Sequence, residues 1–205
     1  MRLWSLSGAA LVLSASFFAQ AGEARDWYTT RGARPPSGDR VYICHGYGCR
    51  LVKPVQLSHA DIAKIAGPLK AGFEDAAAER KALSVSVQVF ETIVGARVGT
   101  AADLPKMQFG RPRADQMDCI DEATNTTSLL RVLAAHDLLK HHRVGEPVAR
   151  GFFLDGRYPH ATAVLSETEG EASWAIDSWP NANGEPPLIQ PMSEWFRARR
   201  SPAPS

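Results

Sequence analysis

Three residues that lie far apart in the chain have the types needed for nucleophilic catalysis. Cys119 opens a predicted helix, where the positive end of the helix dipole stabilises an anion and lowers the pKa of a thiol. His160 opens a predicted strand, and Asp177 lies near the end of the next one. A cysteine nucleophile needs a base, and the base needs a third group that fixes its tautomer. The three residues therefore predict a site with Cys119 as nucleophile, His160 as base and Asp177 as orienting carboxylate.

The two predicted strands can bring His160 and Asp177 together if they form a hairpin. A two-residue turn at Glu169-Gly170 places Thr162 opposite Asp177, and His160 is then its diagonal neighbour on the same face. Diagonal neighbours lie within reach of long side chains. The same register predicts two faces. The face toward the helix carries Thr162, Val164, Ser173 and Ala175, and the other face carries Ala161, Ala163, Leu165, Trp174 and Ile176.

The segments that hold these residues are Gln116 to Asp121, Pro159 to Val164 and Trp174 to Trp179. A cysteine at a helix start, a histidine on a strand and an aspartate on the adjacent strand, in this order and spacing, resemble the transglutaminase-like superfamily. Within it the chain is most similar to the exported bacterial transglutaminase-like cysteine proteinases. The resemblance covers roughly residues 110 to 196. It implies a papain-like α+β fold and a protease or amidase that works through an acyl-enzyme.

The chain departs from that group beside the cysteine. The group tends to have acidic residues on both sides of its cysteine, associated with calcium, whereas here Asp118 matches and Ile120 does not. Asp121 and Glu122 are possible substitutes, but calcium takes six or more oxygen ligands. Carboxylates in the first turn of a helix are explained more simply by the helix dipole. We therefore expect no metal and no cofactor.

Several alternatives remain open for the same residues. The oxyanion of an acyl-transfer reaction needs donors, for which the Cys119 backbone N–H and Gln116 are candidates. The alternative for Gln116 is a solvated loop position. Cys119 can also be a small buried apolar residue, and the protein is then a catalytically inactive binding module. If an amine rather than water takes the acyl group, the enzyme is an acyl transferase or transglutaminase.

The other two cysteines lie close together in the chain. Cys44 and Cys49 are separated by a segment with two glycines, which predicts a small disulfide loop. A zinc site with His45 is the alternative, with His59 as the only plausible fourth ligand. A disulfide exchange activity is disfavoured because such motifs use a two-residue spacing.

The N-terminus predicts export. Residues 1–21 combine a basic start, a short apolar stretch and a small-x-small end, which is typical of a cleaved signal peptide. An uncleaved N-terminal anchor is the alternative. We expect a periplasmic or secreted protein with a protein or peptide substrate in the cell envelope. The 23 basic and 22 acidic side chains leave a net charge of +1, which gives no reason to expect nucleic acid or an anionic membrane as partner.

The remaining sequence predicts how these residues are positioned. An extended segment at 22–40 precedes a single domain at 41–196, and a disordered tail follows at 197–205. The domain has an N-terminal helical part at 41–99 and a catalytic core at 110–196. In the helical part we expect helices from Ser58 to about Gly67 and from about Glu74 to Val94. In the core we expect a helix from Cys119 to about His141 and strands at 147–154, 160–166 and 172–178.

Overall fold

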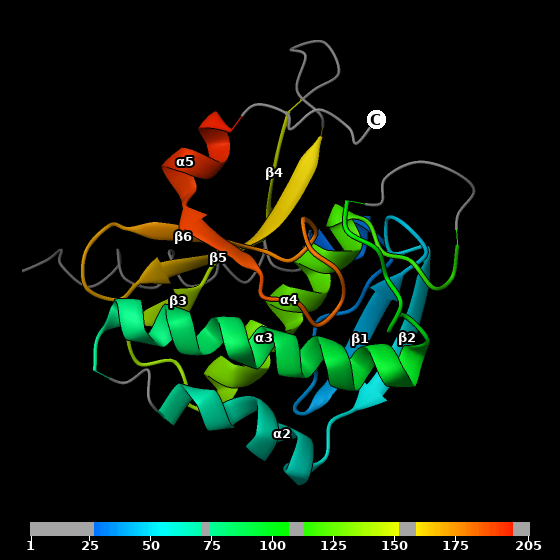
Figure 1. Cartoon of the computed structure of the whole chain (residues 1–205), viewed down its shortest axis with the longest axis horizontal. Coiled ribbons are helices and arrows are strands. Elements are labelled where there is room, and N and C mark those ends of the chain that lie inside the picture. The colour runs from blue at the N-terminus through cyan, green and yellow to red at the C-terminus, as the bar shows by residue number, and fades with distance from the viewer. Residues whose placement is uncertain (1–26, 71–73, 107–112, 152–158, 199–205) are drawn as a thin grey trace, which may run out of the picture.

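The computed structural model describes four stretches of the chain, residues 27–70, 74–106, 113–151 and 159–198 (Figure 1). Within them helices are mixed with antiparallel strands, which confirms the α+β class. The predicted signal peptide at 1–21, the first residues of the 22–40 segment and nearly all of the 197–205 tail lie outside the described residues. None of the helices in the described stretches is long and apolar enough to cross a membrane.

The first two strands form a hairpin that the sequence analysis did not predict. β1 (Arg40–His45) pairs antiparallel with β2 (Leu51–Gln56). The part at 41–99 is therefore helical only after this two-stranded sheet. The pattern of β2 is weak because it contains Pro54 and fully buries only Val55, so the alternation typical of a strand is missing.

Two helices and a short 3₁₀ turn follow the hairpin. α2 (His59–Ala66) begins with the predicted capping box and leads into η1 (Gly67–Lys70). For the next helix the sequence predicts a stop between Gly95 and Gly99, and α3 (Ala76–Val98) continues through Gly95 to the end of that stretch. A Cβ at Gly95 would lie 2.9 Å from the side-chain amide of Asn183, so the glycine allows a close approach. α3 ends instead at Gly99, which adopts φ +98°.

The second half of the chain places one long helix beside a sheet. α4 (Cys119–Ala135) is capped by Asp118, whose side chain accepts hydrogen bonds from the N–H groups of Ile120 and Asp121. The strands of the sheet pair in the order β3-β5-β6-β7, with β4 also paired to β5. They are β3 (His142–Val144), β4 (Val148–Arg150), β5 (His160–Glu167), β6 (Ser173–Asp177) and β7 (Leu188–Pro191), followed by α5 (Met192–Arg197).

The register of β5 and β6 is the predicted one. Ala163 pairs with Ile176, and Leu165 with Trp174, as a turn at Glu169-Gly170 requires. The predicted orientation of the faces is wrong, however. Ala163, Leu165 and Ile176 lie in the main core with leucines of α4, so the odd positions of β5 face the helix. Ala161 and Ala163 are small side chains on this face and allow α4 to lie close to β5.

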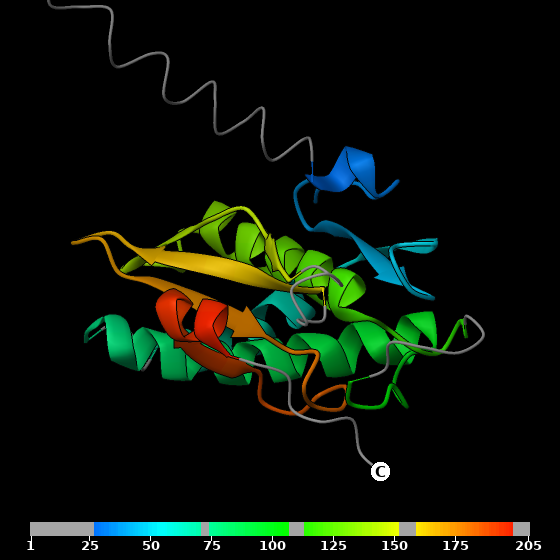
Figure 2. The same ribbon diagram turned by 90° about the horizontal axis from the view of Figure 1, so that it is seen from above.

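The main hydrophobic core joins both halves of the chain. It contains side chains from the β1–β2 hairpin, α2, α3, α4, β5 and β6. In Figure 1, α3 lies below β5 and β6, and α5 lies above them. Figure 2 shows α4 running along β5, in agreement with the close contact of these two elements. One end of β5 therefore meets the beginning of α4.

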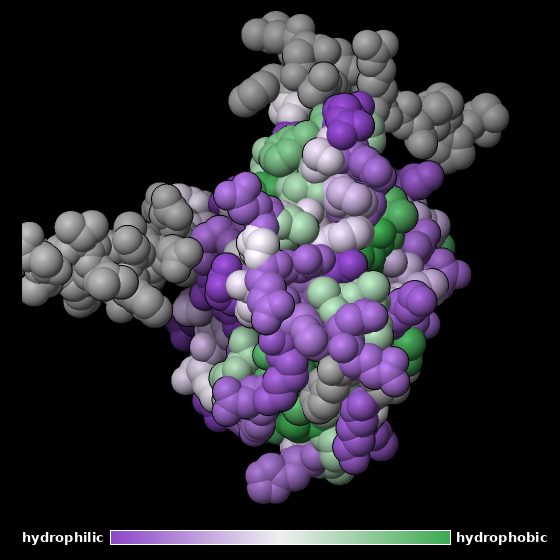
Figure 3. All heavy atoms as spheres, turned by 90° about the vertical axis from the view of Figure 1, so that its left-hand side faces the viewer, coloured by the Kyte–Doolittle hydropathy of each residue, from purple (hydrophilic) through white to green (hydrophobic). Residues whose placement is uncertain are grey.

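Figure 3 shows the opposite end of the molecule, which carries the β5–β6 turn. This face is mostly hydrophilic, with apolar side chains scattered between charged ones. Scattered apolar residues of this kind are ordinary on a protein surface. The other end of the sheet, where β5 begins, carries His160.

Candidate functional site

His160 and Asp177 form a buried hydrogen-bonded pair. The Nε2 atom of His160 lies 2.6 Å from Oδ2 of Asp177, and the two residues are 6% and 3% exposed. A carboxylate can only accept, so the imidazole donates from Nε2. Nδ1 of the same ring has no hydrogen-bond partner. In the neutral tautomer that this pairing selects, Nδ1 is free to accept a proton.

Two tryptophans enclose the imidazole. The ring of Trp179 lies 4.6 Å from the ring of His160, and the ring of Trp195 lies 5.6 Å from it. Trp179 also packs against the cluster that contains Cys119. It therefore contacts both the imidazole and the surroundings of the thiol. Trp195 is not part of the predicted triad; the sequence alone indicates a core or cleft-wall residue, and the side chain is completely buried.

Cys119 lies at the first position of α4 and packs against the beginning of β5. Its thiol is 4.0 Å from the carbonyl oxygen of Pro159 and receives a hydrogen bond from the backbone N–H of Ala161. The sulfur thus contacts the backbone on both sides of His160. No hydrogen bond joins it to the imidazole in this conformation of the described residues. The three predicted residues lie at one end of the sheet. Because the odd positions of β5 face α4, His160 and Asp177 lie on the face turned away from α4, and Nδ1 makes no hydrogen bond to the thiol.

The thiol is covered rather than activated in this conformation. Burial, with a smaller contribution from the negative charge of Asp118, raises the pKa of Cys119 from its usual 9.0 to about 12. The expected lowering of the thiol pKa by the helix dipole is therefore wrong here. Cys119 is 7% exposed and belongs to a small cluster with Ala123 and Ala161. The desolvation of this cluster outweighs the dipole.

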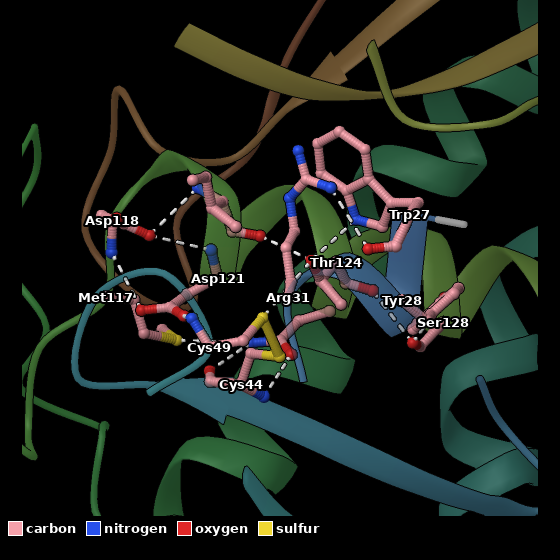
Figure 4. Close-up of a disulfide and its surroundings, with 12 residues drawn as sticks. Trp27, Tyr28, Arg31, Cys44, Cys49, Met117, Asp118, Asp121, Thr124 and Ser128 are labelled. Atoms are coloured by element: carbon pink, nitrogen blue, oxygen red, sulfur yellow. Dashed lines mark hydrogen bonds between the residues drawn. A yellow bond between two sulfur atoms is a disulfide. The ribbon is translucent and has the colours of Figure 1, made fainter. Parts of the chain in front are cut away.

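Part of the cover comes from the N-terminal segment, whose Trp27 and Arg31 are shown beside Thr124 of α4 in Figure 4. Residues 27–30 form a helical turn whose Trp27 packs against the Cys119 cluster. The indole Nε1 of Trp27 donates to Oγ1 of Thr124 at 3.0 Å, and the guanidinium of Arg31 lies 3.4 Å above the indole ring. Tyr28 is fully buried and bonds to Ser128 on the next turn of α4. The segment at 22–40 was predicted to be extended, but from residue 27 it is docked.

Gln116 does not point at the thiol. Its Oε1 accepts from the N–H of Leu104 at 3.1 Å, and its Nε2 donates to the carbonyl oxygens of Ala102 and Asp115. The residue is 1% exposed, so the alternative of a solvated loop position is wrong as well. Its amide anchors the loop before α4 and is not available to an oxyanion in this conformation.

Cys44 and Cys49 form the predicted disulfide (Figure 4). The loop they close docks onto α4, because Asp121 accepts hydrogen bonds from the N–H groups of Tyr47 at 2.8 Å and Cys49 at 2.6 Å. One turn later Asn125 bonds to both backbone groups of Cys44. Among the described residues, the two cysteines and Asp121 are the one group close enough to hold a metal ion. The disulfide and the amide contacts already use these atoms, so the zinc alternative is not supported.

Buried carboxyl groups lie behind the first turn of α4. Burial raises the pKa of Glu91 and of Asp103 to about 7, that of Asp121 to about 8, and that of Glu122 well above its usual value. Asp103 accepts from the N–H of Met117 at 2.6 Å, and Glu91 from the N–H of Gly184 at 2.9 Å. For Glu122 the negative charges of Glu91 and Asp103 add to the effect of burial and raise the pKa further. The sequence analysis, which considered Glu122 as a possible calcium ligand or as a partner of the helix dipole, did not predict that it is buried.

No protein-family model matches the chain, and no curated protein or solved structure matches it. The resemblance to the transglutaminase-like superfamily therefore depends on the order and spacing of Cys119, His160 and Asp177 alone.

Proposed function

We propose that the protein is an exported cysteine hydrolase of the transglutaminase-like type with a papain-like core. The observation that carries the proposal is the buried His160–Asp177 pair, which leaves Nδ1 without a partner while Trp179 packs against both the imidazole and the cluster of Cys119, the cysteine outside the disulfide. A buried, unsatisfied ring nitrogen costs free energy. Such a cost is expected where the atom serves chemistry, because a purely structural histidine gains from a second partner.

The mechanism follows from the direction of the hydrogen bonds. Nδ1 of His160 takes the proton of the Cys119 thiol, and Asp177 stabilises the imidazolium that forms. The thiolate attacks the carbonyl carbon of an amide, whose oxygen becomes an oxyanion. The imidazolium then gives its proton to the leaving amine, and the acyl group stays on sulfur as a thioester. Water, deprotonated by His160, attacks the thioester and releases the acid and the free thiol.

This sequence of steps requires an open form of the site. In the closed form the thiol has a pKa of about 12, so almost no thiolate is present at neutral pH. Trp27 covers part of the Cys119 cluster. It belongs to a short N-terminal segment and is not part of the main core cluster. Displacement of this segment admits water and substrate while the His160–Asp177 pair stays in place. We therefore assign the closed form to the resting state.

The substrate class follows from the same chemistry. A thiolate with a histidine base suits a peptide or carboxamide carbonyl, and the predicted export places the enzyme in the periplasm or outside the cell. We propose a protein or peptide of the cell envelope as the substrate. An amine acceptor in place of water makes the same site an acyl transferase.

One observation favours a second function. The thiol is almost completely buried among apolar side chains, as expected of an inert cysteine in a catalytically inactive binding module. In that case the fold serves protein interaction alone.

A comparison of exported proteins separates the two functions. Strains carrying the parent protein, Cys119→Ser, His160→Ala or the control His136→Ala are compared by mass spectrometry of protein N-termini. His136 is a suitable control because it is exposed and pairs with Asp39, which is not one of the three residues of the proposed triad. The hydrolase predicts N-termini that occur with the parent and His136→Ala and disappear with Cys119→Ser and His160→Ala. Identical N-termini in all four strains support the binding module.

A further inference from the structure

The carboxylate of Asp177 receives two hydrogen bonds on one oxygen. Oδ2 accepts from Nε2 of His160 at 2.6 Å and from the indole Nε1 of Trp195 at 3.1 Å. The other oxygen, Oδ1, is buried and has no partner. Both donors therefore act on the same atom, and the orientation of the carboxylate is determined by two neighbours rather than by one.

Trp195 is also contacted by a residue of β4, Arg150. It lies on α5 and is completely buried. On β4, the guanidinium of Arg150 lies 4.3 Å above the indole ring, and its Nη1 donates to the carbonyl oxygen of Ala198 just after α5. Arg150 is itself the ladder partner of His160. The short helix is thus attached to β4, the strand that pairs with the beginning of β5, where His160 lies.

We propose that Trp195 is a positioning residue of the site: its indole N–H fixes the Asp177 carboxylate so that His160 keeps its proton on Nε2 and presents Nδ1 to the thiol. This inference rests on the proposed function. An indole N–H can donate but cannot accept, so it requires an acceptor at Oδ2. The same oxygen also accepts the hydrogen bond from Nε2–H of His160, and this hydrogen bond selects the tautomer. The C-terminal helix, which had no role in the predicted triad, becomes part of the machinery that supports it.

A core role for Trp195 makes a different prediction from a positioning role. Trp195→Phe keeps an aromatic ring in the buried site and removes only the donor and part of the apolar surface. The chain offers a matched control in Trp174→Phe. Trp174 lies on β6, donates its indole N–H to Glu167 at 3.0 Å and packs under the guanidinium of Arg80 at 3.6 Å. It thus has the same kinds of contact at a place remote from the triad.

The test is the tautomer of His160, measured by ¹H–¹⁵N NMR of the full mature chain with labelled histidine. His160→Gln identifies the resonance. For the parent and Trp174→Phe we expect the proton on Nε2, and for Trp195→Phe a substantial fraction on Nδ1. The rate at which iodoacetamide alkylates Cys119 should fall about tenfold in Trp195→Phe, the size expected when a hydrogen bond to a charged group is lost. An unchanged tautomer in Trp195→Phe overturns the inference.

The outcomes also separate this inference from the proposed function. If the tautomer changes in Trp195→Phe but replacement of His160 leaves the alkylation rate of Cys119 unchanged, the positioning role is supported and the proposed enzymatic function is contradicted. If Trp195→Phe does not fold, the test uses a second measurement, the indole N–H resonance of Trp195 in the parent protein. That resonance should shift in Asp177→Asn, whereas the Trp174 resonance should not. An indole resonance that ignores Asp177→Asn overturns the positioning role.

Discussion

Replacement of Trp27 by alanine should expose the thiol of Cys119. Trp27 is one of three partly buried apolar side chains that pack against the Cys119 cluster, together with Ile120 and Trp179. Of these, it alone comes from the N-terminal segment, so its removal leaves α4 and the wall beside His160 intact. Water then reaches the sulfur from the side that the indole occupied, and the desolvation that dominates the raised thiol pKa decreases.

The size of the effect follows from that pKa. A thiol with a pKa of about 12 is ionised to roughly one part in ten thousand at pH 8, against roughly one part in ten for a pKa of 9.0. Full exposure is therefore expected to raise the thiolate fraction about a thousandfold. Trp27→Ala removes only part of the cover, so we expect an increase of at least tenfold in the alkylation rate, below that ceiling.

The assay is the rate of iodoacetamide alkylation at pH 8, followed by mass spectrometry of the peptide that contains Cys119. Arg34→Ala is the matched control, because Arg34 belongs to the same segment but is exposed and contacts Tyr42 rather than the thiol cluster. Equal rates in the parent, Trp27→Ala and Arg34→Ala, with all three folded, would refute the assignment of Trp27 as a cover.

Three further predictions concern the pair, the disulfide and the buried acids. Asp177→Asn should slow His160-dependent alkylation by at least a hundredfold, since an amide no longer selects the tautomer or stabilises the imidazolium; a rate equal to the parent contradicts this. Replacing Cys44 and Cys49 by alanine should lower the free energy of unfolding by about 2 kcal/mol for a loop of this length, measured in urea, and no change contradicts the docking of the loop on α4. Glu91 keeps its proton up to about pH 7 when folded but only to about 4.5 when unfolded, so stability falls as pH rises through this interval by about 3 kcal/mol. In Glu91→Gln this part of the pH dependence should disappear, and an unchanged slope between pH 5 and 8 contradicts the raised pKa.

Local signals predicted the elements that carry the triad. The beginning of α4 follows from Asp118, whose side chain caps the first N–H groups, and the register of β5 and β6 follows from a turn that Glu169-Gly170 can form. Both are decided by residues within a few positions of one another. The hydrogen bond between His160 and Asp177 is a consequence of that register and was predictable for the same reason.

Features decided by distant residues were not predictable in this way. The cover over Cys119 depends on Trp27, which is ninety-two positions earlier in the chain (119 minus 27). The face of β5 that meets α4 is chosen by the whole core, since both faces carry small side chains. Gln116 bonds to a loop formed by residues 102–104, and β7 and α5 are too short to show a hydrophobic period.

The most direct test of the central claim compares the uncovered thiol with and without its base. Alkylation of Cys119 at pH 7 is measured in Trp27→Ala and in the double variant Trp27→Ala/His160→Ala. If the imidazole takes the thiol proton, the first protein reacts at least tenfold faster than the second, and the difference shrinks above pH 9, where an exposed thiol ionises unaided. Equal rates at pH 7 would show that His160 does not act on Cys119, and the enzymatic account would be wrong.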